Sequence, residues 1–201
     1  MFFPASTSDY EFIEKKSRFI ARAERIDSVE QPREIVKQLR KNHPAARHVV
    51  HAFVLGKKAE VHGASDDGEP SGTAGKPVLE LIKGRDVTNI IITVIRYFGG
   101  IKLGTGGLVR AYSQAARGAL EGLVLEEQID CVEFKIECPY SVYEIVKSAL
   151  LKAEARIVKE NFTEDIEIEG IIPQKMADGL EKTLLDISGG KIELKIIAFG
   201  G

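Results

Sequence analysis

The sequence predicts an α+β protein of two domains, and three observations lead to this class. Residues 88–97, TNIIITVIRY, are too apolar to alternate, which indicates a strand buried on both faces. Beyond residue 128, helical and strand periodicities follow one another in the order βαββαβ. Charge is also divided: residues 1–128 hold 19 basic and 16 acidic side chains, whereas the remainder holds 9 and 14.

The first domain is expected to alternate between strands and helices. Alternation over residues 8–27, broken by polar residues 14–17, predicts a hairpin or one long bent strand. Ser28 offers an N-cap to a helix that ends before His43 and Pro44. The expected elements that follow are a strand at 48–55 with a partner near 58–62, a loop at 63–77, a short helix at 78–83, the buried strand at 88–97 and a helix at 105–123.

That last helix should place one apolar face on the core. The spacing of its side chains predicts this face, and it consists of Leu108, Val109, Tyr112, Ala115, Ala116, Ala119 and Leu123.

The second domain gives the clearer pattern. Its expected elements are strand 129–138, helix 141–153, strand 156–162, strand 165–172, helix 173–187 and strand 191–199. The order βαββαβ predicts a ferredoxin-like sandwich, a sheet covered by two helices on one face. We expect the domains to be residues 1–126 and 127–201, with the boundary near 125–128.

Composition excludes several classes of protein. No apolar run approaches the ~20 residues that cross a bilayer, and the first residues lack the pattern of a signal peptide, so we expect a cytoplasmic protein with no membrane contact. Cys131 and Cys138 lie on one expected strand with side chains on opposite faces, so we expect them to be reduced.

A glycine-rich loop leads into the helix at residue 105. Gly99, Gly100, Gly104, Gly106 and Gly107 imply positive φ angles, close packing or close approach of a ligand. A helix N-terminus favours an anion, and Lys102 would reinforce its field, so phosphate is the natural ligand. The candidate binding residues are Arg96, Lys102, Gly104, Thr105, Gly106, Gly107, Arg110 and Lys76; the alternative is a purely structural connection.

Known nucleotide motifs fit this loop poorly, and we expect no cofactor. Gly104-Thr105-Gly106 is followed by Val109 where a dinucleotide-binding fingerprint needs glycine or alanine. Gly75-Lys76 is followed by Pro77, which breaks the phosphate-loop pattern.

A second candidate motif consists of Asp66, Asp67, Glu69, Ser71 and Thr73. Its carboxylates could hold a cation or exchange protons, but their spacing is not that of a calcium loop and acidic turns are usually solvated. The histidines do not share a face, so we expect no metal site. Because no nucleophile with an orienting base can be named, a binding protein is favoured over an enzyme.

Residues 15–47 form the densest basic run of the chain. Two interpretations remain open: a solvated amphipathic surface, or a footprint for a polyanion.

Two long motifs in this order resemble the YigZ/IMPACT family: DDGEPSGTAGKP at residues 66–77 and RYFGGIKLGTGGLVRAY at residues 96–112. The resemblance covers the chain from about Tyr10 onward. It implies a first domain like domain IV of elongation factor G and a small-subunit ribosomal protein, and a second domain like the ferredoxin-like domain V of that factor. Eukaryotic IMPACT proteins restrain a translation-initiation kinase pathway, but they also carry an RWD domain. With nine residues before Tyr10, we expect no such domain here.

The sequence and this resemblance together predict an RNA- or ribosome-associated binding protein that regulates translation, with a protein partner as a further possibility. The alternative is an enzyme or binding protein for a small phosphorylated ligand, with Asp66, Asp67 and Glu69 facing Lys102 across a cleft. Nothing in the sequence indicates the oligomeric state.

Overall fold

The structure is a computed structural model that describes residues 1–197. Contacts between residues divide the chain into two compact units, Met1–Gln128 and the part that begins at Ile129. Each unit has its own buried apolar cluster, and each is described separately below. Within residues 1–197, no helix has both the length and the apolar character needed to cross a bilayer.

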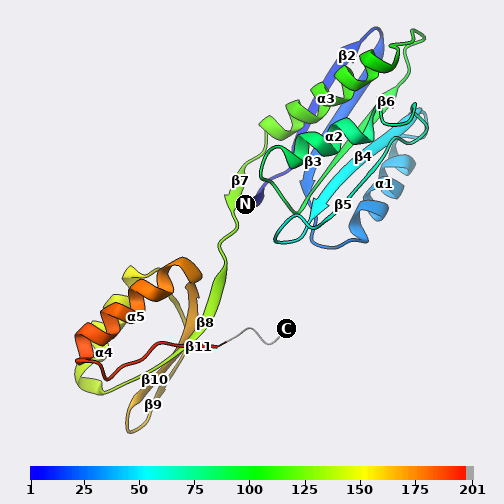
Figure 1. Cartoon of the computed structure of the whole chain (residues 1–201). Coiled ribbons are helices and arrows are strands. Elements are labelled where there is room, and N and C mark those ends of the chain that lie inside the picture. The colour runs from blue at the N-terminus through cyan, green and yellow to red at the C-terminus, as the bar shows by residue number, and fades with distance from the viewer. Residues whose placement is uncertain (198–201) are drawn as a thin grey trace. The chain divides into compact units, whose positions relative to one another are not determined.

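The first unit is built on a five-stranded antiparallel sheet of order β2-β3-β6-β4-β5. Along the chain its elements are β1 (Phe2–Pro4), β2 (Ser8–Glu14), β3 (Ser17–Arg25), α1 (Gln31–Asn42), β4 (His48–Leu55), β5 (Val61–Ser65), α2 (Gly75–Lys83), β6 (Ile90–Tyr97), α3 (Thr105–Glu121) and β7 (Leu125–Glu127). Helices α2 and α3 cover one face of the sheet and α1 covers the other (Figure 1).

The central strand β6 is buried on both faces, as its unbroken apolar sequence predicts. Ile90, Ile92 and Val94 join the cluster that α2 and α3 cover. Ile91 points the other way and packs with Ile26 near α1. Alternating side chains of one strand therefore supply two cores, which is why this strand does not alternate in hydropathy.

The strand signals of this unit are confirmed, whereas the cap of its first helix was predicted wrongly. Residues 8–25 form a hairpin, in which Lys15 and Lys16 have positive φ and make the two-residue turn. Ser28 does not cap α1, which begins three residues later. Instead the Gln31 side chain accepts hydrogen bonds from the amides of residues 27 and 28 at 2.5 and 3.0 Å.

Two further boundaries differ from the prediction. Strand β5 spans Val61–Ser65, where the expected partner strand lay near residues 58–62, and α2 begins at Gly75, so the loop between them spans only residues 66–74. On α3, Val109 is exposed, whereas Ala111 and Leu120 belong to the buried face. The prediction for Val109 was wrong because the small residues of α3 lie closest to the sheet and turn that position outward.

A short ribbon not expected from the sequence joins the two ends of this unit. Strand β1 pairs antiparallel with β7, with Phe2 opposite Glu127 and Pro4 opposite Leu125. Three-residue strands carry too little periodicity to be recognised in a sequence.

The second unit contains its elements in the predicted order: β8 (Cys131–Cys138), a 3-10 turn (Tyr140–Val142), α4 (Tyr143–Lys152), β9 (Arg156–Phe162), β10 (Ile166–Pro173), α5 (Gln174–Ser188) and β11 (Lys195–Ile197). The strands form one antiparallel sheet of order β11-β8-β10-β9, and both helices cover the same face (Figure 1). Residues 198 and 199 of the expected last strand lie outside the described residues. Cys131 and Cys138 are both free.

Candidate functional site

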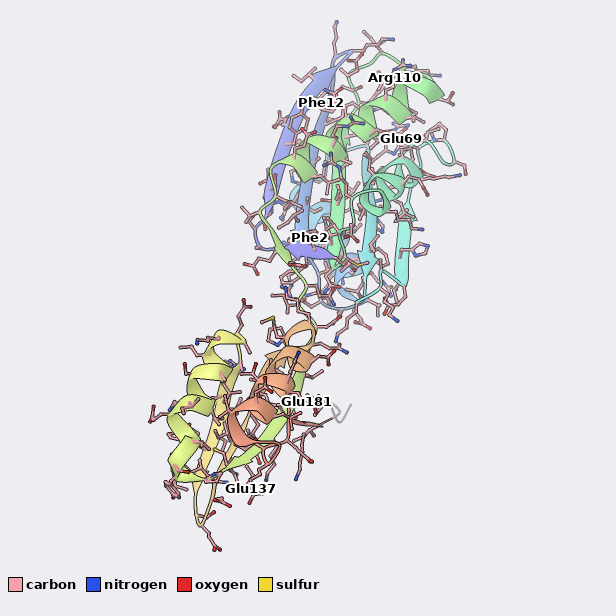
Figure 2. The ribbon with its side chains drawn as sticks, turned by 60° about the vertical axis from the view of Figure 1, so that its left-hand side comes forward. Phe2, Phe12, Glu69, Arg110, Glu137 and Glu181 are labelled. Carbon is pink, nitrogen blue, oxygen red and sulfur yellow. The ribbon has the colours of Figure 1, made fainter. Side chains whose placement is uncertain are left out.

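A cavity of about 420 Å³ lies in the first unit, where the end of β6, the loop after β5 and the start of α3 meet. It is lined by Arg47, His48, Glu69, Pro70, Arg96, Phe98, Lys102, Leu103, Gly104, Thr105 and Leu108. Figure 2 shows that Glu69 and Arg110 lie at this end of the unit. The two long motifs of the sequence therefore contribute to one site.

An ion pair between Glu69 and Arg96 forms the buried wall of the cavity. Arg96 Nη1 donates to Glu69 Oε1 at 2.6 Å, and both side chains are about 5% exposed or less. The hydroxyl of Tyr112 donates to the same oxygen at 2.8 Å, and Arg96 Nη2 donates to Ser17 Oγ at 3.3 Å. Four elements distant in sequence are thus joined by one polar network.

This network is shielded from water, and the burial shifts the pKa of its phenol. Burial, followed by the nearby Glu69 carboxylate, raises the pKa of the Tyr112 phenol well above its ordinary value. The Arg96 guanidinium lies 5.4 Å from the ring centre of Phe19 and 5.6 Å from that of Phe98. Its Nε is buried and has no hydrogen-bond partner among residues 1–197.

His48 presents one ring nitrogen toward this wall. Its Nδ1 lies 2.8 Å from the carbonyl oxygen of Asp67, which can only accept, so Nδ1 carries the proton. Nε2 lies 3.7 Å from Glu69 Oε1, too far for a hydrogen bond. Burial lowers the pKa of His48 and outweighs the attraction of Glu69, so the ring is neutral at pH 7.

The aspartates of the second motif are engaged in local structure and not in the cavity. Asp66 accepts hydrogen bonds from the amides of Gly72, Ala74 and Gly75 at 2.7 to 3.0 Å, and so holds the start of α2. Burial alone would raise the pKa of Asp66, but these three amides bring it below its ordinary value. Asp67 accepts from the amide of Val49 at 2.5 Å.

The hydroxyls of this motif lie outside the cavity. The Thr73 hydroxyl donates to the carbonyl oxygen of Pro70 at 2.6 Å, and Ser71 is exposed. Of the five residues in the motif, Glu69 is therefore the one that lines the cavity.

Packing or backbone conformation explains most glycines of the loop. A side chain at Gly99 would overlap the backbone of Lys16 in the β2–β3 turn. Gly100 and Gly104 have φ of +86° and +72°, which favour glycine. A Cβ at Gly107 would lie 3.0 Å from the Leu103 side chain.

Gly106 fits none of these explanations. Its φ is not positive, and the nearest atom to an added Cβ would be the end of the Arg110 side chain at 3.9 Å. An added Cβ would make only an ordinary van der Waals contact there, so neither packing nor backbone conformation requires glycine at this position of the first turn of α3. Close approach of a ligand is the remaining reason among those that the sequence suggested.

The N-terminus of α3 carries no side-chain cap and opens toward the cavity. Gly104 is the N-cap, and its own carbonyl accepts the amide of Leu108 at 2.9 Å. Lys102 and Arg47 are exposed beside it, and within residues 1–197 neither side chain has an ion-pair or hydrogen-bond partner. Since Glu69 is paired with Arg96, the field in the cavity is positive.

The structure brings together some of the predicted binding residues and separates others. Arg96, Lys102, Gly104 and Thr105 line the cavity. Arg110 and Gly107 line a separate depression with Glu14 and Lys15, and Lys76 is exposed on α2. Sequence reasoning did not place Arg47, Ser17 or Tyr112 in the site; Tyr112 could have been found because a buried phenol needs a partner for its hydroxyl.

The basic run at residues 15–47 is neutralised only in part. Four of its arginines pair with carboxylates: Arg18 with Glu11, Arg22 with Asp9, Arg25 with Asp27 and Arg40 with Asp67. These pairs satisfy four of the ten cations at residues 15–47, and that part of the run is a solvated surface of exposed ion pairs.

Comparison with known proteins gives consistent matches over this chain. Residues 15–120 match the model of the Impact N-terminal domain. An IMPACT family member of Haemophilus influenzae is 35% identical, with 98% of this chain and 97% of that protein covered. The IMPACT family member YigZ of Escherichia coli is 36% identical over 91% of each chain. A crystal structure of a hypothetical protein has 34% identity and a TM-score of 0.65, with 98% and 97% covered. This chain therefore belongs to the IMPACT family.

Proposed function

We propose that this chain is an RNA- or ribosome-associated binding protein that regulates translation. The observation that carries the proposal is the position of Lys102 and Arg47, two cations without partners among residues 1–197, beside the uncapped N-terminus of α3. Phosphate groups are the anions that such a site binds best, because amides and cations converge on them. RNA supplies these groups in a repeating array.

Family membership supports translation as the process in which the protein acts. The first unit is proposed to resemble domain IV of elongation factor G, and the second is proposed to be ferredoxin-like. The strand order β11-β8-β10-β9, with both helices on one face, supports the second assignment. Because the second unit is acidic, we assign it contact with a protein partner and not with RNA phosphates.

The test is filter binding of the full chain to ribosomal subunits and to unrelated RNA at several salt concentrations. Each lost phosphate contact should reduce the slope of log affinity against log salt by about 0.7–0.9, so Lys102→Ala and Arg47→Ala should each reduce it by about that amount. Lys182→Ala, an exposed cation on α5, is the matched control and should change nothing. Absence of binding, or an unchanged slope in both cavity variants, would contradict the proposal.

A second candidate function is binding of a small phosphorylated ligand. The observation that favours it is the volume of the cavity, about 420 Å³, within the ~300–1,000 Å³ typical of ligand pockets. Pro70, Leu103 and Leu108 give it apolar walls. Glu69 supports the site and is not a free acid or base, since Arg96 and Tyr112 hold its Oε1. Equilibrium dialysis with inorganic phosphate and nucleotides, without RNA, separates this function from the first.

A further inference from the structure

We propose that the cavity binds one unpaired nucleotide, with its base on the ring of Phe98 and its phosphate at the N-terminus of α3. The inference rests on the phosphate contacts proposed above and adds the class of ligand. The nucleotide can be a single-stranded position of an RNA or a free nucleoside phosphate, because both present the same base and phosphate.

Phe98 provides the platform for the base. The ring follows β6 directly, lines the cavity and is 47% exposed. The Arg96 guanidinium lies 5.6 Å from its centre, and Arg96 is fixed by Glu69 and Ser17. The ring therefore lies against a buried cation while part of it remains exposed to solvent, an arrangement that suits stacking of a planar base.

The apolar part of the wall faces the same space. Leu103, Leu108 and Pro70 line the cavity with Phe98. A phosphate alone gains nothing from these side chains, whereas the faces of a base or ribose carbons gain contact area with them. The lining thus indicates a ligand with an apolar body and an anionic end.

The anionic end has two independent supports. The first is the start of α3, a 17-residue helix with no side-chain cap, beside Lys102. The second is Arg96, which is 4% exposed and lines the cavity while its Nε finds no acceptor among residues 1–197. A buried donor without a partner is costly, so Arg96 has a hydrogen-bonding demand that residues 1–197 leave unmet.

A base inside a duplex cannot use this platform. Both of its faces are already stacked on neighbouring base pairs, so only an unpaired or extruded nucleotide can lie on Phe98. The site should therefore distinguish single-stranded from double-stranded RNA, which phosphate contacts alone do not require.

The test uses an RNA oligonucleotide with one 2-aminopurine, in single-stranded and in duplex form, together with adenosine monophosphate and inorganic phosphate as separate probes. The full chain should change the emission of the single strand and not that of the duplex. Phe98→Ala should weaken single-strand binding on the order of 10- to 100-fold, and Phe98→Tyr, which keeps the ring, should restore it. Phe162→Ala removes an aromatic that is 56% exposed in the second unit and should have no effect.

The outcomes separate this inference from the proposed function. Equal binding of single strand and duplex, without dependence on Phe98, overturns the inference while RNA binding stands. Phe98-dependent binding of adenosine monophosphate without RNA binding supports the nucleotide site and overturns the proposed function. Inorganic phosphate that binds as tightly as the nucleotide overturns the inference, because the base then contributes nothing. Binding of no probe overturns both.

Discussion

Glu69 and Arg96 lie 27 residues apart in the chain, yet a hydrogen bond of 2.6 Å joins their buried side chains. The pair connects the loop after β5 to the end of the central strand β6, so it holds the wall of the cavity in place. A buried ion pair adds little stability beyond that of well-packed apolar residues, but loss of one partner leaves the other charge buried and uncompensated.

The Glu69→Gln variant should therefore lose stability in the first unit by about 3–5 kcal/mol. Amide hydrogen exchange at β6 measures the free energy of opening in this unit separately from the second. The control is Glu11→Gln, which breaks the exposed pair with Arg18 and should cost far less, because solvent screens that pair. Equal losses of stability in the two variants would show that burial does not determine how much the Glu69–Arg96 pair contributes to stability.

Tyr112 should resist ionisation in the folded protein. Its pKa is raised by burial and then by Glu69, whereas the unfolded chain releases this proton near pH 10. The stability that depends on Tyr112 is therefore present below pH 10 and is lost as the pH rises above it. In an absorbance titration, wild type and Tyr112→Phe should show the same number of phenols that ionise before alkaline unfolding. One phenol fewer in the variant would show that Tyr112 titrates normally.

Asp66 should contribute stability that acid removes. Its carboxylate accepts three backbone amides at the start of α2, and its pKa is lowered below the ordinary 3.8. Asp66→Ala should cost about 0.5–2 kcal/mol at neutral pH, as loss of a helix cap does.

This contribution is present above about pH 3.8 and is lost as the pH falls through the lowered folded-state pKa. Exchange at the β6 amides should therefore show a difference between wild type and Asp66→Ala at pH 6 that shrinks toward pH 3. Asp178→Ala, at an exposed position of α5, is the control. A difference that is the same at both pH values would contradict the role of the carboxylate.

The sequence allowed most elements of the fold to be predicted, because long periodic segments carry their own signal. Strands β4 and β9 begin and end where the periodicity places them. The start of α2 was missed because it depends on Asp66, nine residues before Gly75 in the chain. Caps made by distant side chains leave no local pattern.

The site was predicted less completely, for the same physical reason. The motifs identify Glu69, Arg96 and Lys102 as candidates, but only the fold shows that Glu69 pairs with Arg96 while Lys102 stays unpaired. Arg47 lies in a basic run whose other arginines are largely paired, so composition gives no sign that it lines the cavity. Ion pairs between residues distant in the chain decide which cations remain free to bind a ligand. The spacing of residues along the chain does not predict these pairs.

Gly99 and Gly106, two glycines of the same sequence motif, should respond in opposite ways to alanine. Gly99→Ala places a methyl group against the backbone of Lys16, which cannot move without shifting the β2–β3 turn, so it should destabilise the first unit by about 1–3 kcal/mol. Gly106→Ala meets no atom closer than 3.9 Å and lies in a helix, so it should leave stability unchanged or raise it by about 0.5–1 kcal/mol. Exchange at the β6 amides measures both.

Gly106→Ala is also the sharper probe of the site. Since its methyl group is added to the first turn of α3, beside the proposed phosphate site, and clashes with no residue, it should weaken RNA binding in the filter assay although the fold is intact. A variant that is stable and binds as wild type would mean that the ligand does not approach this turn. A variant that is destabilised would mean that Gly106, like Gly99, serves the packing of the chain.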